Sequence, residues 1–61
     1  MSLPKDPFML LSYINTQLRD NFSSLSELAA STGEDEAAIR ETLKNAGFVY
    51  DEDLNRFTAG Q

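Results

Sequence analysis

The stretch LAASTGEDEAAI, residues 28–39, decides the fold. The stretch has an apolar residue followed by alanine (Leu28 and Ala29), then Gly33, and then an apolar residue six positions after that glycine (Ile39). This pattern is typical of a helix-turn-helix. Gly33 suits the left-handed conformation that ends a helix. In DNA-binding proteins the second helix of this motif enters the major groove. Here that helix opens with the three acidic residues 34–36, so the shape and the charge point to different functions.

Another helix is expected before this motif, and the first helix of the motif has a clear start. The preceding helix is predicted from Asp6, a good N-cap followed by proline, to near Asp20. The first motif helix begins with a capping box, in which Ser24 and Glu27 can satisfy each other's free backbone N–H groups. It is expected to stop at Gly33.

The second motif helix is expected to use Asp35 as its N-cap and to stop at Gly47. The apolar period then changes from helical to alternating, which predicts two short strands over residues 48–50 and 56–58, joined by a polar turn. Asn55 suits a left-handed turn conformation, and residues 59–61 are expected to fray. The predicted core residues are Leu10, Leu11, Ile14, Leu18, Leu25, Leu28, Ala29, Ile39, Leu43, Ala46, Phe48, Tyr50 and Phe57.

The order of elements predicts one α+β domain over residues 1–61: a three-helix helix-turn-helix core followed by a small β-hairpin, a miniature winged helix. A chain of 61 residues buries only about 60% of the surface that it exposes when unfolded, so burial in a homodimer would add stability. The sequence has no cysteine, which excludes disulfides and thiolate metal sites. No apolar run is long enough for a membrane span, and a cytoplasmic location is expected.

The charge of −5 is unevenly distributed along the chain. Residues 1–33 hold two basic and three acidic residues, a net charge of −1. Residues 34–61 hold three basic and seven acidic residues, a net charge of −4. The half that would touch DNA in a helix-turn-helix protein is therefore the acidic half.

Three segments resemble a known family: SLPKDPFMLLSYINTQLRDNFSSL from residue 2, ELAASTGEDEAAI from residue 27 and AGFVYDEDLNRF from residue 46. They are similar to the domain of unknown function 4250, a family of very short bacterial proteins. The resemblance implies a small cytoplasmic protein with a winged-helix-like shape. It implies no activity, because none is assigned to the family.

A partner-binding patch is the favoured site. On the first helix, Phe8, Met9 and Tyr13 fall away from the core stripe by the helical angle per residue, and Val49 falls on the outer face of the hairpin. Exposed apolar side chains that gather in this way mark protein contacts, although Tyr13 and Met9 could instead cover the core. The expected partner is a protein, with a homodimer as one form. No structural role is expected for three polar residues of the same helix: Asn15, Gln17 and Arg19.

Nucleic-acid binding is the alternative, and it would depend on Arg40 and Lys44. Affinity for DNA comes largely from basic residues that neutralise phosphates, and these are the only two on the exposed face of the second motif helix. Glu36 lies one turn before Arg40 in the orientation that favours an ion pair. The sequence therefore argues against independent DNA binding, and it leaves a transcription-related adaptor as the second hypothesis.

Catalytic, cofactor, metal and small-molecule sites are not predicted. Asp51, Asp53 and Asn55 have the opening spacing of a calcium loop, but Arg56 stands where such a loop needs glycine. The acidic residues fall in turns, caps and polar faces, where nothing separates their pKa values for acid–base work. A non-catalytic interaction module is the function that the sequence favours.

Overall fold

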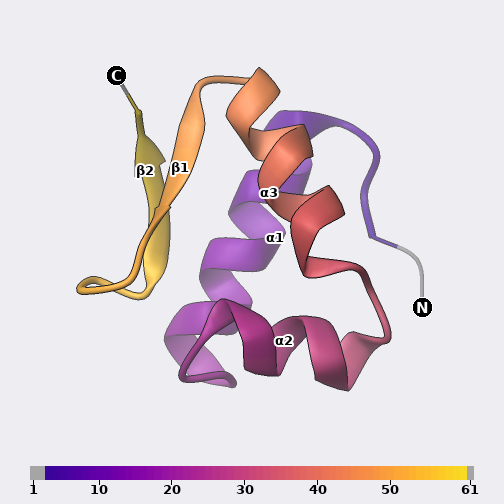
Figure 1. Cartoon of the computed structure of the whole chain (residues 1–61), viewed down its shortest axis with the longest axis vertical. Helices are drawn as coiled ribbons and strands as arrows, with labels where there is room; N and C mark the ends of the chain where they lie inside the picture. Colours follow the sequence, from indigo (N-terminus) through magenta and orange to yellow (C-terminus); the bar gives the residue numbers. More distant parts are fainter. Residues whose placement is uncertain (1–2, 61) are drawn as a thin grey trace.

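A computed structural model describes residues 3–60 and places three helices before one antiparallel hairpin (Figure 1). The α+β class predicted from the sequence is confirmed. The elements are α1 (Pro7–Asp20), α2 (Leu25–Thr32), α3 (Glu36–Asn45), β1 (Phe48–Asp51) and β2 (Arg56–Ala59).

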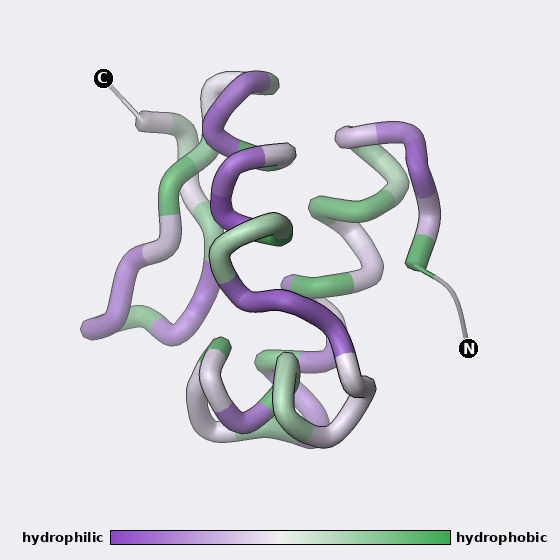
Figure 2. Tube along the Cα trace, turned by 45° about the vertical axis from the view of Figure 1, so that its right-hand side comes forward, coloured by the Kyte–Doolittle hydropathy of each residue, from purple (hydrophilic) through white to green (hydrophobic). Residues whose placement is uncertain are grey.

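The core lies where the three helices and the inner face of the hairpin meet. The hairpin stands beside α1 and α3, while α2 crosses one end of α1 (Figure 1). Along α3, hydrophobic and hydrophilic residues alternate at helical spacing (Figure 2). The buried hydrophobic residues are Leu10, Ile14, Leu18, Leu25, Leu28, Ala29, Ile39, Leu43 and Phe57.

The predicted helix ends are largely confirmed. The Ser24 hydroxyl accepts a hydrogen bond from the backbone N–H of Glu27 at 3.1 Å. The Asp35 carboxylate accepts one from the backbone N–H of Ala37 at 2.9 Å. Gly33 ends α2 in the left-handed conformation, with φ 74°. Side chains and turn geometry thus satisfy backbone groups that a helix end leaves free.

Details of two helix starts and one helix end differ from expectation. Asp6 occupies the N-cap position of α1, but its side chain makes no capping hydrogen bond. The carboxylate of Glu27 accepts bonds from the backbone and hydroxyl of Ser23 rather than from Ser24. Ala46 is only half-buried, because it is the C-cap of α3 and lies past the last buried turn of that helix.

The hairpin pairs Tyr50 with Phe57, and their rings pack with centroids 5.4 Å apart. Asn55 adopts the left-handed conformation expected of it, with φ 53°. The expectation of fraying is wrong for residues 59 and 60: Ala59 belongs to β2, and the N–H of Gly60 bonds to the carbonyl of Gly47 at 2.8 Å. Gln61 lies outside the described residues.

Asn15 joins α1 to the outer edge of β2. Because the Gly47–Gly60 pair is hydrogen-bonded and such pairs alternate along an antiparallel ladder, the backbone groups of Phe57 face away from β1. The Asn15 amide meets both of them. It donates to the Phe57 carbonyl at 3.1 Å and accepts from the Phe57 N–H at 2.7 Å. The expectation that Asn15 has no structural role is therefore wrong.

Asn55 makes a second connection, from the hairpin turn to the helices. Its amide donates to the carbonyls of Leu18 and Phe22, both at 3.0 Å. Its oxygen accepts from the Tyr50 hydroxyl at 2.5 Å, and that hydroxyl in turn accepts from the N–H of Leu25 at 3.3 Å. The two asparagines fix the position of the hairpin relative to α1.

Replacing Asn15 with alanine leaves two partly buried backbone groups of Phe57 without a partner. Asn15→Ala should lower the free energy of unfolding by about 1–3 kcal/mol, the cost of an unsatisfied buried polar group. Urea denaturation followed by circular dichroism measures this change. Gln17→Ala is the matched control on the same helix, because the Gln17 amide accepts its hydrogen bond from Asn21 at the surface.

The control variant should change the free energy of unfolding by less than about 0.5 kcal/mol, as surface substitutions usually do. Equal destabilisation by Asn15→Ala and Gln17→Ala would show that the Asn15–Phe57 pairing does not hold the hairpin in place.

Candidate functional site

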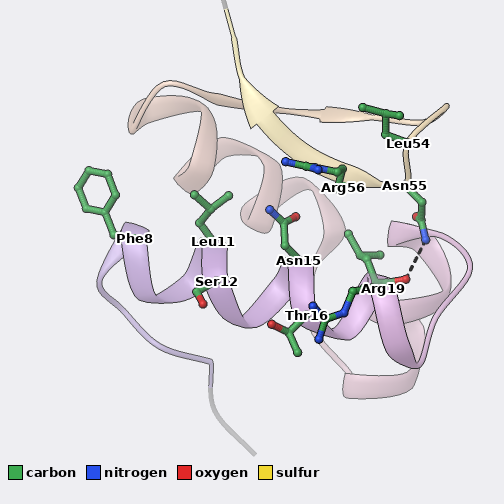
Figure 3. A pocket seen from close by; sticks show the side chains of 10 residues that line it. Phe8, Leu11, Ser12, Asn15, Thr16, Arg19, Leu54, Asn55 and Arg56 are labelled. Carbon is green, nitrogen blue, oxygen red and sulfur yellow. Dashed lines mark hydrogen bonds between the residues drawn. The ribbon is translucent and has the colours of Figure 1, made fainter.

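An open groove of about 680 Å³ runs between α1 and the hairpin (Figure 3). One wall is formed by α1 from Phe8 to Arg19, and the other by the end of the hairpin turn and the first residue of β2. The lining residues are Phe8, Leu11, Ser12, Asn15, Thr16, Leu18, Arg19, Leu54, Asn55 and Arg56.

Large apolar side chains are exposed at both ends of this groove. Phe8 stands at the start of α1 and is 64% exposed, although its ring also meets Phe48 edge-on with centroids 6.1 Å apart. Leu54, in the hairpin turn, is 59% exposed. Leu11 is half-buried between them. Figure 3 shows Phe8 and Leu54 at opposite ends. Water contacts a large apolar area here, and a partner could cover it.

The charged residues of the groove are all basic. Arg19 and Arg56 line it, and no aspartate or glutamate does, although the chain has ten acidic residues and five basic ones. The Arg19 guanidinium bonds to the neighbouring Asp20 at 3.0 Å, and this hydrogen bond holds the pKa of the Asp20 carboxyl below its ordinary value. Within residues 3–60, Arg56 has no ion-pair partner. The groove thus presents one guanidinium without an ion pair in the described residues, that of Arg56, and one that is paired with Asp20.

The two asparagine amides of the groove have structural roles. The amides of Asn15 and Asn55 are engaged with backbone groups of β2, α1 and the segment after α1. Ser12 and Thr16 supply hydroxyls along the same face of α1. The groove therefore offers apolar contacts and two guanidinium groups, held on elements that the asparagines fix.

The four residues predicted to form one patch differ in exposure and in what they line. Phe8 lines the groove, whereas Met9, 62% exposed, lies about 100° further round the helix. Tyr13 is half-buried and packs against the core. Val49 is 43% exposed on the outer face of the hairpin. Phe8 and Leu54 mark the two ends of the groove, and the other three residues of the predicted patch do not line it.

Arg40 and Lys44 line a second groove, of about 400 Å³, between α3 and β1. The Arg40 guanidinium bonds to Glu36 at 2.9 Å and lies 5.2 Å from the centre of the Tyr50 ring. Glu36 also accepts from the Ser26 hydroxyl at 2.7 Å. The Ser26 bond and then the Arg40 bond hold the pKa of Glu36 below its ordinary value. The charge of Arg40 is thus largely paired within the protein.

The residues with calcium-loop spacing shape the hairpin turn. The Asp51 carboxylate accepts from the N–H groups of Asp53 and Leu54, at 2.9 and 3.2 Å. Asn55 points to the helices instead. Among residues 3–60, no three histidine, cysteine or acidic side chains are grouped as metal ligands. No helix in the same range is long and apolar enough to cross a membrane.

Sequence reasoning missed Leu54 and Arg56 as surface residues that share a site with α1. Leu54 did carry a signal, because it is the single apolar residue in an otherwise polar turn. Arg56 carried no such signal in the sequence, because its side chain lies beside α1 only once the hairpin packs against that helix. Its place in the groove follows from contacts between distant parts of the chain.

Comparison with known proteins gives one match. No curated protein and no solved structure is significantly similar to the chain. The family model described as "Domain of unknown function (DUF4250)" matches residues 4–57, which include all three helices, β1 and the first half of β2. The resemblance inferred from the sequence is confirmed, and the chain belongs to the DUF4250 family.

Proposed function

We propose that the chain is a non-catalytic protein-interaction module that also self-associates. The observation that carries this proposal is the groove between α1 and the hairpin, with exposed Phe8 and Leu54 at its ends. Side chains of this size stay in water only at a cost in free energy, and a partner that covered them would recover it.

The chemistry of the groove supports a binding role rather than catalysis. The lining residues include no carboxylate, and the chain has no histidine or cysteine to act as a base or a thiol nucleophile. The two asparagine amides are engaged with the backbone. What remains suits recognition, because arginine combines hydrogen bonding with apolar contact and is enriched at interfaces.

A DNA-binding adaptor is the second candidate, and one observation favours it. Arg40 and Lys44 both line the groove of about 400 Å³ between α3 and β1. Against it, Arg40 is paired with Glu36, and Glu41 lines that groove as well. Two cations among acidic side chains supply little of the phosphate neutralisation on which DNA affinity depends.

Binding to duplex DNA should stay in the non-specific range. Fluorescence anisotropy with a labelled duplex should give a dissociation constant no tighter than about 10⁻⁴ to 10⁻⁶ M at about 150 mM salt. Arg40→Ala/Lys44→Ala should behave like the parent protein, and Arg19→Ala/Arg56→Ala serves as a matched loss of two charges outside the groove beside α3. Tighter binding that depends steeply on salt, and that is lost only in Arg40→Ala/Lys44→Ala, would favour the DNA-binding adaptor.

Self-association should depend on Met9, which is 62% exposed on α1 and is not among the residues that line the groove. The parent chain should sediment with a concentration-dependent mass, and Met9→Glu should weaken association by about tenfold or more because it places a charge in an apolar contact. Ser31→Glu, an equal charge change at an exposed position of α2, is the control. A parent chain that sediments as a monomer at every concentration would refute self-association.

A further inference from the structure

We propose that the groove between α1 and the hairpin binds a short acidic, amphipathic segment of another protein. This inference rests on the proposed interaction function and names the chemistry of the partner. Its elements are the apolar side chains Phe8, Leu11 and Leu54 and the guanidinium groups of Arg19 and Arg56.

The dimensions of the groove suit a short segment. Its wall on α1 extends from Phe8 to Arg19, a length of about 17 Å at 1.5 Å per residue. That length matches about three turns of a helix or about five residues of an extended strand. Apolar side chains of the partner would meet Phe8 and Leu11 in the first part of the groove. Carboxylates would meet the arginines nearer its other end, where Figure 3 shows Arg19, Arg56 and Leu54.

Charge selects the partner. The groove holds two of the five basic residues of the chain and none of its ten acidic ones. Guanidinium groups bind carboxylates in a bidentate geometry, and Arg56 has no ion pair within residues 3–60. Two exposed hydrogen bonds, of 3.0 and 3.1 Å, join the Arg19 guanidinium to Asp20. Arg19 would therefore exchange one carboxylate for another when the partner binds, whereas Arg56 would gain a new one.

Two other occupants fit less well. A second copy placed across a two-fold axis would bring the same two arginines into the interface twice, with no carboxylate from the groove to pair with them, because such an interface uses the same surface twice. A nucleic acid would offer phosphates to the arginines, but it would also run past the acidic turn at residues 51–53 and meet a protein of net charge −5. A short segment with a few carboxylates carries less negative charge past that turn than a duplex does, and it brings no second pair of arginines into the interface.

The test is a selection from a random 12-residue peptide library displayed on phage, with the full chain as bait. The enriched sequences should combine aspartate or glutamate with leucine, phenylalanine or methionine. A synthetic, labelled copy of the most enriched peptide then gives dissociation constants by fluorescence anisotropy. Arg56→Gln, Arg19→Gln and Leu54→Ser should each weaken binding by about tenfold.

Arg40→Gln is the matched control, since it removes the same charge from α3 outside this groove. It should leave the dissociation constant within about twofold of the parent value. Leu54→Ser lies in an exposed turn and Arg56→Gln on an exposed strand position, so circular dichroism should show both variants folded.

Several results would overturn the inference. Enriched peptides without acidic residues, or peptides whose binding survives Arg56→Gln and Leu54→Ser, would show that the groove does not select an acidic segment, while an interaction function would stand. Loss of self-association in the same two variants would assign the groove to a second copy. Tight duplex binding that Arg56→Gln abolished would assign it to nucleic acid. If no peptide is enriched, the inference that the groove binds an acidic segment is refuted. Sedimentation then tests self-association separately.

Discussion

The paired hydrogen bonds between the Asn15 amide and the backbone of Phe57 are the constraint on which the arrangement depends. A two-stranded hairpin is barely stable alone in water, and its outer edge exposes backbone groups that need partners. Asn15 offers one donor and one acceptor in the place of a third strand. The pairing fixes β2 against α1, carries Phe57 into the core, and so creates the groove on the outer side of the same contact.

Local features of the sequence were enough to predict the elements. Ser24, Gly33 and Asp35 act at helix ends through neighbouring backbone groups, so their roles depend on a few adjacent residues. The spacing of Ile39 and Leu43 determines the buried face of α3 in the same local way. Asn55 in the left-handed conformation follows from turn chemistry. These predictions succeeded because the forces that decide them act within one or two turns of chain.

The site could not be predicted to the same degree. Asn15 looks like any polar helix residue until Phe57, 42 positions later, lies beside it. The predicted patch grouped Phe8 with Met9, Tyr13 and Val49, whereas in the structure Phe8 lines the groove with Leu11 and Leu54 and the other three residues do not line it. The angles between residues around a helix show which side chains point away from the core. They do not show which distant element will pack beside them.

The Tyr50 hydroxyl has a further consequence. It connects the hairpin turn to the start of α2, and its ring lies beneath the Arg40 guanidinium. The chain has no tryptophan and two tyrosines, of which Tyr13 is the other. Departure of the hairpin from the helices would break the hydrogen bond that the phenol accepts from the Leu25 N–H and expose the ring to water, while the bond to Asn55 lies within the hairpin. The ultraviolet absorbance and emission of the unlabelled protein therefore provide an intrinsic optical reporter of that local opening.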